Sequence, residues 1–104
     1  MSENWDVVSY SRRTVFQAIN VERKYQNIKW GDKPHTVAEW LLIMRSELDE
    51  AERGWVKNGG DVRALEEVLQ TVAVGVACLE QHGVYHQTSH ATAIIAANQE
   101  EKSK

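Results

Sequence analysis

The fold is decided by the stretch from Thr36 to His82, which reads TVAEWLLIMRSELDEAERGWVKNGGDVRALEEVLQTVAVGVACLEQH. Apolar residues recur in it at intervals of three and four on both sides of Gly59 and Gly60. This spacing is typical of amphipathic helices, and paired glycines supply the left-handed backbone that ends a helix. The stretch therefore predicts two long helices joined by one tight turn.

The ends of these two helices are marked by residues that satisfy free backbone groups. Thr36 and Glu39 form a T-x-x-E capping box, which predicts that the first helix begins directly after Thr36. Asp61 is a good N-cap for the second helix, and Gly83 is expected to end that helix after His82.

The second helix of the pair is expected to be the centre of the fold. Its main apolar stripe consists of Val62, Leu65, Leu69, Val72, Val76 and Leu79. Between Val68 and Leu79 only Gln70 and Thr71 are polar, and a helix that is apolar on nearly every side is buried on nearly every side. A short chain with two such helices has surplus apolar surface, so we expect it to be at least dimeric.

The outer segments are also helical in pattern. One helix is expected from Asp6 to Gln26, a connector with a tryptophan from Asn27 to His35, and a fourth helix between Val84 and Glu100. The charged residues of the first helix are expected to face water: Arg12, Arg13, Glu22, Arg23 and Lys24. Helices joined by short loops pack antiparallel, so the sequence predicts a single all-α domain over residues 1–104, a four-helix bundle with flexible ends at about 1–5 and 101–104.

Composition narrows the possible functions. The formal net charge is −3 with acids and bases mixed, so a nucleic acid polymer is not an expected partner. No apolar segment reaches the length of a membrane span, and no signal peptide is evident at the start. The single cysteine, Cys78, excludes a disulfide framework and indicates a cytoplasmic protein.

Two pairs of polar residues, each three positions apart, are the candidate site. Glu47 and Glu50 lie beside the apolar stripe of the first helix of the pair. Glu67 and Gln70 lie roughly opposite the main stripe of the second helix, on a side that is apolar beyond the pair and is therefore also expected to be covered by protein. A buried carboxylate is costly unless it is paired, and a cation bound by several carboxylates removes that cost. Three carboxylates and one amide oxygen are hard donors that suit Mg²⁺ or Mn²⁺. Solvated acids on exposed helices are the alternative interpretation.

Glu47–Ala51 (ELDEA) and Glu67–Gln70 (EVLQ) resemble the two acidic elements of the MazG-like all-α nucleoside triphosphate pyrophosphohydrolases. The resemblance covers a little under half of the chain. That family places glutamates on one helix and an E-x-x-D on the next, within a four-helix and usually dimeric fold. Here Gln70 stands at the place of the aspartate, and Ile43 and Met44 stand where a further glutamate pair is often found.

The resemblance implies hydrolysis of a (deoxy)nucleoside triphosphate to the monophosphate and pyrophosphate, as in cleansing of the nucleotide pool. It implies Glu47, Glu50, Glu67 and Gln70 as metal ligands, with Glu50 also orienting or deprotonating the attacking water. Arg53 and Lys57 become candidates for phosphate, and Trp30 and His35 for the base. Trp30 is alternatively a lid on the core. Two other functions stay open: a nucleotide- or metal-binding protein with weakened catalysis, and a plain helical assembly protein.

Overall fold

The computed structural model describes residues 10–85 and 88–103, and these residues form helices and connecting segments. The expected all-α class is confirmed, with four α-helices and no strand in the described ranges. The helices are α1 (Arg12–Trp30), α2 (Val37–Gly54), α3 (Gly60–His82) and α4 (Thr88–Ser103), and a π-helical segment, η2 (Trp55–Gly59), joins α2 to α3.

Helix α1 begins and ends later than the sequence predicted. The expected start at Asp6 lies outside the described residues, and α1 begins after Ser11, whose Oγ accepts a hydrogen bond from the Thr14 amide. The helix continues past Gln26 to Trp30 and ends at Gly31, which has a φ of 77°. Trp30 is therefore the last residue of a helix rather than part of a loop.

Helix α2 begins as predicted. The Thr36 side chain accepts a hydrogen bond from the Glu39 amide at 3.1 Å, and the Thr36 amide donates to Glu39 Oε1 at 2.8 Å. This hydrogen bond to the Thr36 amide is the main reason why the pKa of Glu39 lies below its ordinary value. Both halves of the capping box are present, so α2 starts at Val37.

The turn between α2 and α3 differs from the prediction. It is a π-helical continuation, and only Gly60 of the two glycines has a positive φ, 59°. Gly59 is required for a steric reason, because a Cβ there would collide with the side chain of Arg63. Asp61 was wrongly predicted as an N-cap: its carboxylate instead accepts a hydrogen bond from Trp55 Nε1 at 2.8 Å.

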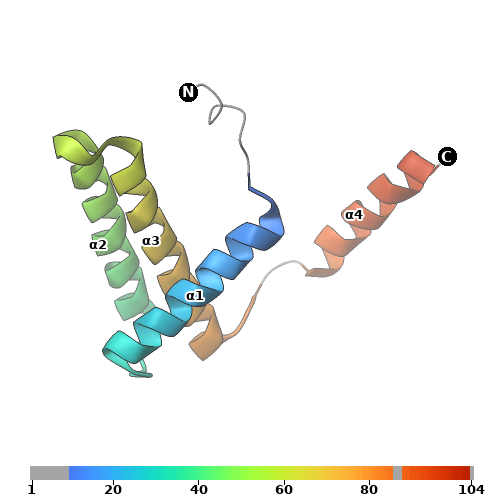
Figure 1. The fold of residues 1–104 in the computed structure, drawn as a ribbon. Helices are drawn as coiled ribbons and strands as arrows, with labels where there is room; N and C mark the ends of the chain where they lie inside the picture. The colour runs from blue at the N-terminus through green and yellow to red at the C-terminus, as the bar shows by residue number, and fades with distance from the viewer. Residues whose placement is uncertain (1–9, 86–87, 104) are drawn as a thin grey trace.

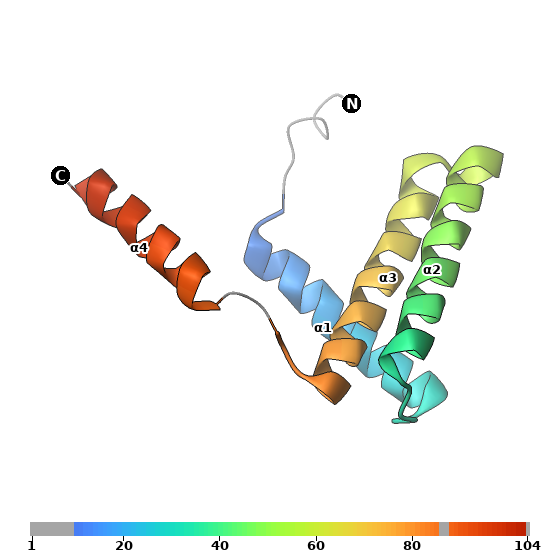
Figure 2. The same ribbon diagram turned by 180° about the vertical axis from the view of Figure 1, so that it is seen from behind.

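Helices α2 and α3 lie antiparallel and side by side, and α1 crosses α3 near the end that carries His82 (Figures 1 and 2). Small residues let these helices approach closely: Ala73, Val74 and Ala77 of α3 are buried, and Met44 of α2 lies against Gly75. Trp40 packs on Val74 and Ala77 to form the centre of the core. Helix α3 is therefore central, as expected.

Two expectations about packing are not met. The large-residue stripe of α3 is not core: Leu65 is 60% exposed and Val72 is 41% exposed, because α2 and α1 pack on the side that carries the alanines. Helix α4 stands apart from α1, α2 and α3 in both views, so these residues do not form a closed four-helix bundle within one chain (Figures 1 and 2). Of the ends expected to be flexible, 1–5 and 104 lie outside the described residues, and 101–103 belong to α4.

None of the helices in the described part of the chain combines the length and the apolar character that crossing a membrane requires.

Candidate functional site

Three carboxylates from two helices meet where α2 and α3 pack. One oxygen each of Glu47, Glu50 and Glu67 lies within 4.8 Å of the others, and we call these three residues the acidic cluster. Glu47 and Glu50 are one helical turn apart on α2, and α3 brings Glu67 to them from the other helix. Glu47 and Glu67 are partly buried, whereas Glu50 is exposed. Oxygen ligands from two rigid helices are the kind of donor set that holds Mg²⁺ or Mn²⁺.

The cluster is electrostatically unfavourable as three bare carboxylates. Oε2 of Glu47 and Oε2 of Glu67 are both buried and have no hydrogen-bond partner among the described residues. Burial raises the pKa of Glu47, and the negative charges of Glu50 and Glu67 raise it further. A divalent cation bound by these oxygens would offset both the desolvation and the repulsion, so the residues present fit a metal ion.

This electrostatic cost predicts a pH dependence of stability. The pKa of Glu47 in the folded chain lies above its ordinary value of 4.5, so folding favours the protonated form. Without metal, the Glu47 carboxylate destabilises the fold at neutral pH, and this loss is recovered as the pH falls through the raised pKa toward 4.5. Glu47→Gln is expected to have a higher melting temperature than the parent at pH 7.5 in EDTA, with the difference shrinking toward pH 4.5. A difference that does not change with pH would contradict this origin.

Helix α1 contributes to the site, which the sequence did not predict. Glu22 is partly buried, its Oε2 accepts a hydrogen bond from Gln26 Nε2 at 3.5 Å, and its charge is among those that raise the pKa of Glu47. Gln26 is 3% exposed and also donates to the main-chain oxygen of Gln70 at 3.3 Å. The signal that could have found them is the spacing of Ile19, Glu22, Arg23, Gln26 and Trp30 along one side of α1.

Arg23 was predicted to face water, and this prediction is wrong, because the side chain is buried and only 8% of the residue is exposed. Its guanidinium donates to Glu80 Oε1 at 2.6 Å, to Asn27 Oδ1 at 3.1 Å and to Gln26 Oε1 at 3.3 Å. The Nε–H has no partner among the described residues. The pairing with Glu80 holds the guanidinium in a fixed position between α1 and α3.

A cavity of about 540 Å³ lies between α1, the connector (now residues 31–36, since α1 extends to Trp30) and the α2–α3 pair. This volume is in the range of small-molecule sites. Glu47 belongs both to its wall and to the acidic cluster, so the cavity and the cluster adjoin at this residue. Trp30 and His35, the residues expected to bind the base, also line it. The remaining lining residues are Arg23, Gln26, Asn27, Gly31, Asp32, Lys33, Trp40, Ile43, Val74, Ala77, Glu80 and Gln81.

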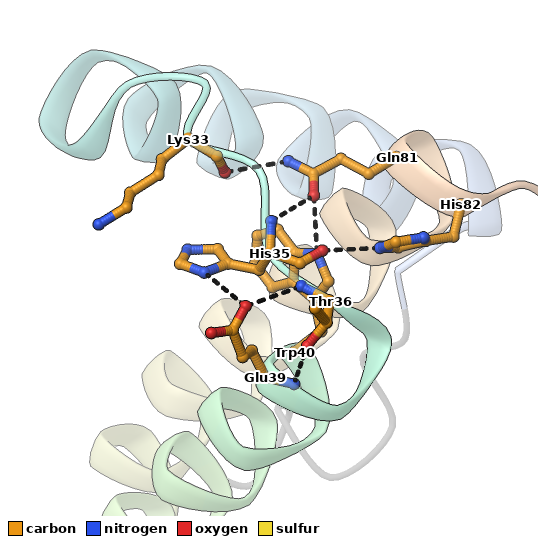
Figure 3. Close-up of polar contacts among 7 residues, drawn as sticks. All are labelled: Lys33, His35, Thr36, Glu39, Trp40, Gln81 and His82. Atoms are coloured by element: carbon orange, nitrogen blue, oxygen red, sulfur yellow. Dashed lines mark hydrogen bonds and ion pairs between the residues drawn. The ribbon is translucent and has the colours of Figure 1, made fainter.

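Hydrogen bonds hold the connector against the end of α3 and so fix this wall of the cavity (Figure 3). Gln81 Oε1 accepts from the His35 amide at 3.0 Å and from Trp40 Nε1 at 2.9 Å, and Gln81 Nε2 donates to the Lys33 carbonyl at 3.1 Å. His82 Nε2 bonds the His35 carbonyl at 2.7 Å. The His35 ring meets the Trp40 ring edge-on, with centroids 4.8 Å apart.

The other predicted site residues have different positions. Trp30 is 54% exposed, so it forms an open edge of the cavity rather than a buried lid. Arg53 pairs with Asp49 at 3.0 Å on the surface of α2, and Lys57 is exposed in η2. Neither Arg53 nor Lys57 lines the cavity, where the cationic side chains are Arg23 and Lys33.

Gln70 lies one turn beyond Glu67 on α3 and is partly buried. Its backbone oxygen, held by Gln26, is the part of the residue that connects α3 to α1. Three of the four expected ligands, Glu47, Glu50 and Glu67, bring a carboxylate to the site, and Gln70 has an amide in its place.

The chain matches no protein-family model, and no curated protein and no solved structure is significantly similar to it.

Proposed function

We propose that the protein is a metal-dependent nucleoside triphosphate pyrophosphohydrolase, which converts a (deoxy)nucleoside triphosphate to the monophosphate and pyrophosphate. The observation that supports this most is that the acidic cluster adjoins a nucleotide-sized cavity at Glu47, which belongs to both. An aromatic and amide-lined cavity suits a base and sugar, and adjacent carboxylates suit the metal that accompanies phosphates.

The proposed roles follow the positions of the side chains. Glu47, Glu50 and Glu67 would hold Mg²⁺ or Mn²⁺, and the ion would supply charge neutralisation on the phosphate oxygens. Glu50, the exposed member of the cluster, orients a water molecule and takes its proton as the water oxygen bonds to the α phosphorus. The bond from that phosphorus to the oxygen bridging the α and β phosphates breaks in the same step, and pyrophosphate leaves. Arg23 and Lys33 replace Arg53 and Lys57 as the cations for phosphate, and Trp30 and His35 contact the base.

The state of the single cysteine also fits the cytoplasmic setting that the sequence predicted. Cys78 is a free, partly buried thiol, which suits a reducing cytoplasm. The substrate is then one member of a soluble nucleotide pool, and the enzyme's role is removal of unwanted nucleotides from that pool.

The direct test is a screen of common and damaged nucleoside triphosphates for pyrophosphate release, with Mg²⁺, with Mn²⁺ and with EDTA. The proposal expects release that depends on the metal, and equal amounts of monophosphate and pyrophosphate. Release of inorganic phosphate alone would identify a different hydrolase. Absence of turnover for every nucleotide would contradict the proposed enzymatic activity.

Gln70 favours one other function, a nucleotide- and metal-binding protein with weakened catalysis, because an amide brings no charge to the metal. Thermal stabilisation by Mg²⁺ together with a nucleotide, without product formation, would identify this function. Indifference to both would leave a helical assembly protein.

Gln70→Asp is expected to tighten Mg²⁺ binding about tenfold, since affinity for such ions depends on the number of charged ligands. Isothermal titration calorimetry measures the change directly, and Gln70→Asn serves as the control because it has the same reach without the charge. Equal affinity of the aspartate and asparagine variants would show that position 70 does not reach the metal.

A further inference from the structure

Position 70 leaves one corner of the acidic cluster without a charge. Gln70 lies one turn beyond Glu67 on α3, and its side chain carries a neutral amide. The three carboxylates of the cluster come from α2 and α3 alone. The affinity of an oxygen site for a divalent cation rises with the number of charged ligands, so a further carboxylate at this corner would strengthen the site.

Helix α1 brings a carboxylate to this corner. It crosses α3 (Figures 1 and 2), and Glu22 on it is partly buried. Gln26 Nε2 donates a hydrogen bond to Glu22 Oε2 at 3.5 Å and to the main-chain oxygen of Gln70 at 3.3 Å. Glu22 and Gln70 therefore lie on either side of a single nitrogen atom.

The orientation of Gln26 is fixed by its other contacts. Gln26 is 3% exposed, and its Oε1 accepts a hydrogen bond from Arg23 Nη1 at 3.3 Å. Arginine can only donate, so the amide oxygen must face Arg23 and the amide nitrogen must face Glu22 and Gln70. Only one oxygen of Glu22 is used in this way, because Oε1 has no hydrogen-bond partner among the residues that the structure describes.

The charge of Glu22 acts on the acidic cluster without belonging to it. Burial is the main cause of the raised pKa of Glu47, and the charge of Glu22 is one of the smaller causes. Glu22 is not among the three residues whose oxygens lie within 4.8 Å of one another. It is therefore close enough to interact with an ion in the cluster but is not placed as a direct ligand.

We propose that Glu22 is the fourth carboxylate of the metal site, acting on the ion through a bound water molecule and supplying the charge that Gln70 lacks. Mg²⁺ bound by carboxylates usually keeps several water molecules, and groups that hold the ligands of an ion contribute to its affinity. Glu22 Oε1 is the oxygen that would accept from such a water, while Gln26 holds Oε2. Glu22 is then a positioning residue, and this inference rests on the metal site of the proposed function.

Isothermal titration calorimetry of the full chain with Mg²⁺, in the absence of nucleotide, tests the role of Glu22. Glu22→Gln is expected to weaken Mg²⁺ binding at least about tenfold. The glutamine keeps an oxygen that can accept from Gln26, so a purely structural role of Glu22 would leave the affinity unchanged. Glu66→Gln removes the same charge from an exposed side chain next to Glu67 and is expected to bind Mg²⁺ within about twofold of the parent.

A double variant tests whether Glu22 serves the corner that Gln70 leaves uncharged. Glu22→Gln combined with Gln70→Asp returns one negative charge to this corner, and it is expected to bring the Mg²⁺ affinity back to within about threefold of the parent. Circular dichroism and thermal melting in EDTA check the fold. Glu22→Gln is expected to melt no lower than the parent there, because it removes one of the charges that repel Glu47.

The outcomes separate this inference from the proposed enzymatic activity. Folded Glu22→Gln that binds Mg²⁺ within about twofold of the parent would overturn the inference, and so would a double variant that binds no better than Glu22→Gln. A parent that binds no Mg²⁺ at millimolar concentration would overturn it as well. Binding that depends on Glu22 in a protein that releases no pyrophosphate would support the inference and contradict the proposed hydrolysis.

Discussion

Glu47→Gln and Glu67→Gln are each expected to lower metal-dependent pyrophosphate release by at least about 100-fold, the scale seen when one group that stabilises transition-state charge is removed. Each change keeps the size of the side chain and removes one negative charge from the acidic cluster. Because the buried Oε2 atoms have no partner within the described residues, the helices have no reason to unfold. Steady-state pyrophosphate release at saturating Mg²⁺, together with circular dichroism, measures both effects.

The chain offers closely matched controls. Glu66 is adjacent to Glu67 but exposed, and Glu52 is an exposed glutamate on α2 that does not belong to the cluster. Glu66→Gln and Glu52→Gln change the net charge by the same amount, so they are expected to keep activity within about twofold of the parent. If all four variants lose activity equally, the effect comes from overall charge. If none loses it, the acidic cluster is not the site.

The parts of the structure that could be predicted from the sequence are those decided by nearby residues. The capping box at Thr36 and Glu39 satisfies its own hydrogen bonds within four residues, so the start of α2 was predictable. The Glu47–Glu50 pair is set by helical geometry alone. Its meeting with Glu67 required only that α2 and α3 form an antiparallel pair, which the short connection between them enforces.

The parts that were missed depend on contacts between distant residues. Arg23 was expected to face water because arginine usually does, but Glu80, 57 residues later, provides the acceptor that makes its burial tolerable. Asp61 looked like a helix cap, yet the π-helical turn brings Trp55 close enough to use its carboxylate first. Local patterns do not contain this competition between partners.

The apolar pattern of α3 shows why the buried side of this helix was also predicted wrongly. Periodicity indicates that a stripe is buried, but it does not identify what buries it. Ala73, Ala77 and Gly75 pack against α1 and α2 because small residues permit close approach, which leaves the larger side chains outside. The sequence therefore predicted that α3 is the central helix but not which of its sides is buried.

Trp40→Ala is expected to destabilise the fold by about 3–5 kcal/mol, the usual cost of removing a large aromatic side chain from a core. Trp40 is 8% exposed, packs on Val74 and Ala77, and donates Nε1–H to Gln81. The loss is a large part of the roughly 5–15 kcal/mol that stabilises a domain. Urea denaturation at one fixed protein concentration measures it, so that association does not change the comparison.

Two further substitutions separate the packing of Trp40 from its hydrogen bond and from ligand binding. Trp40→Phe keeps an aromatic ring, although a smaller one, and loses the donor, so it is expected to cost at least about 1 kcal/mol but less than Trp40→Ala. Trp30→Ala removes a ring that also lines the cavity but is 54% exposed, so stability should change by less than about 1 kcal/mol while the KM for the nucleotide rises about tenfold. Loss of stability in Trp30→Ala as large as in Trp40→Ala would show that both tryptophans are structural and that the cavity lacks its proposed base platform. Unchanged stability in Trp40→Ala would show instead that the core at the cavity wall does not hold α2 to α3, and the wall would then have no fixed shape with which to select a nucleotide.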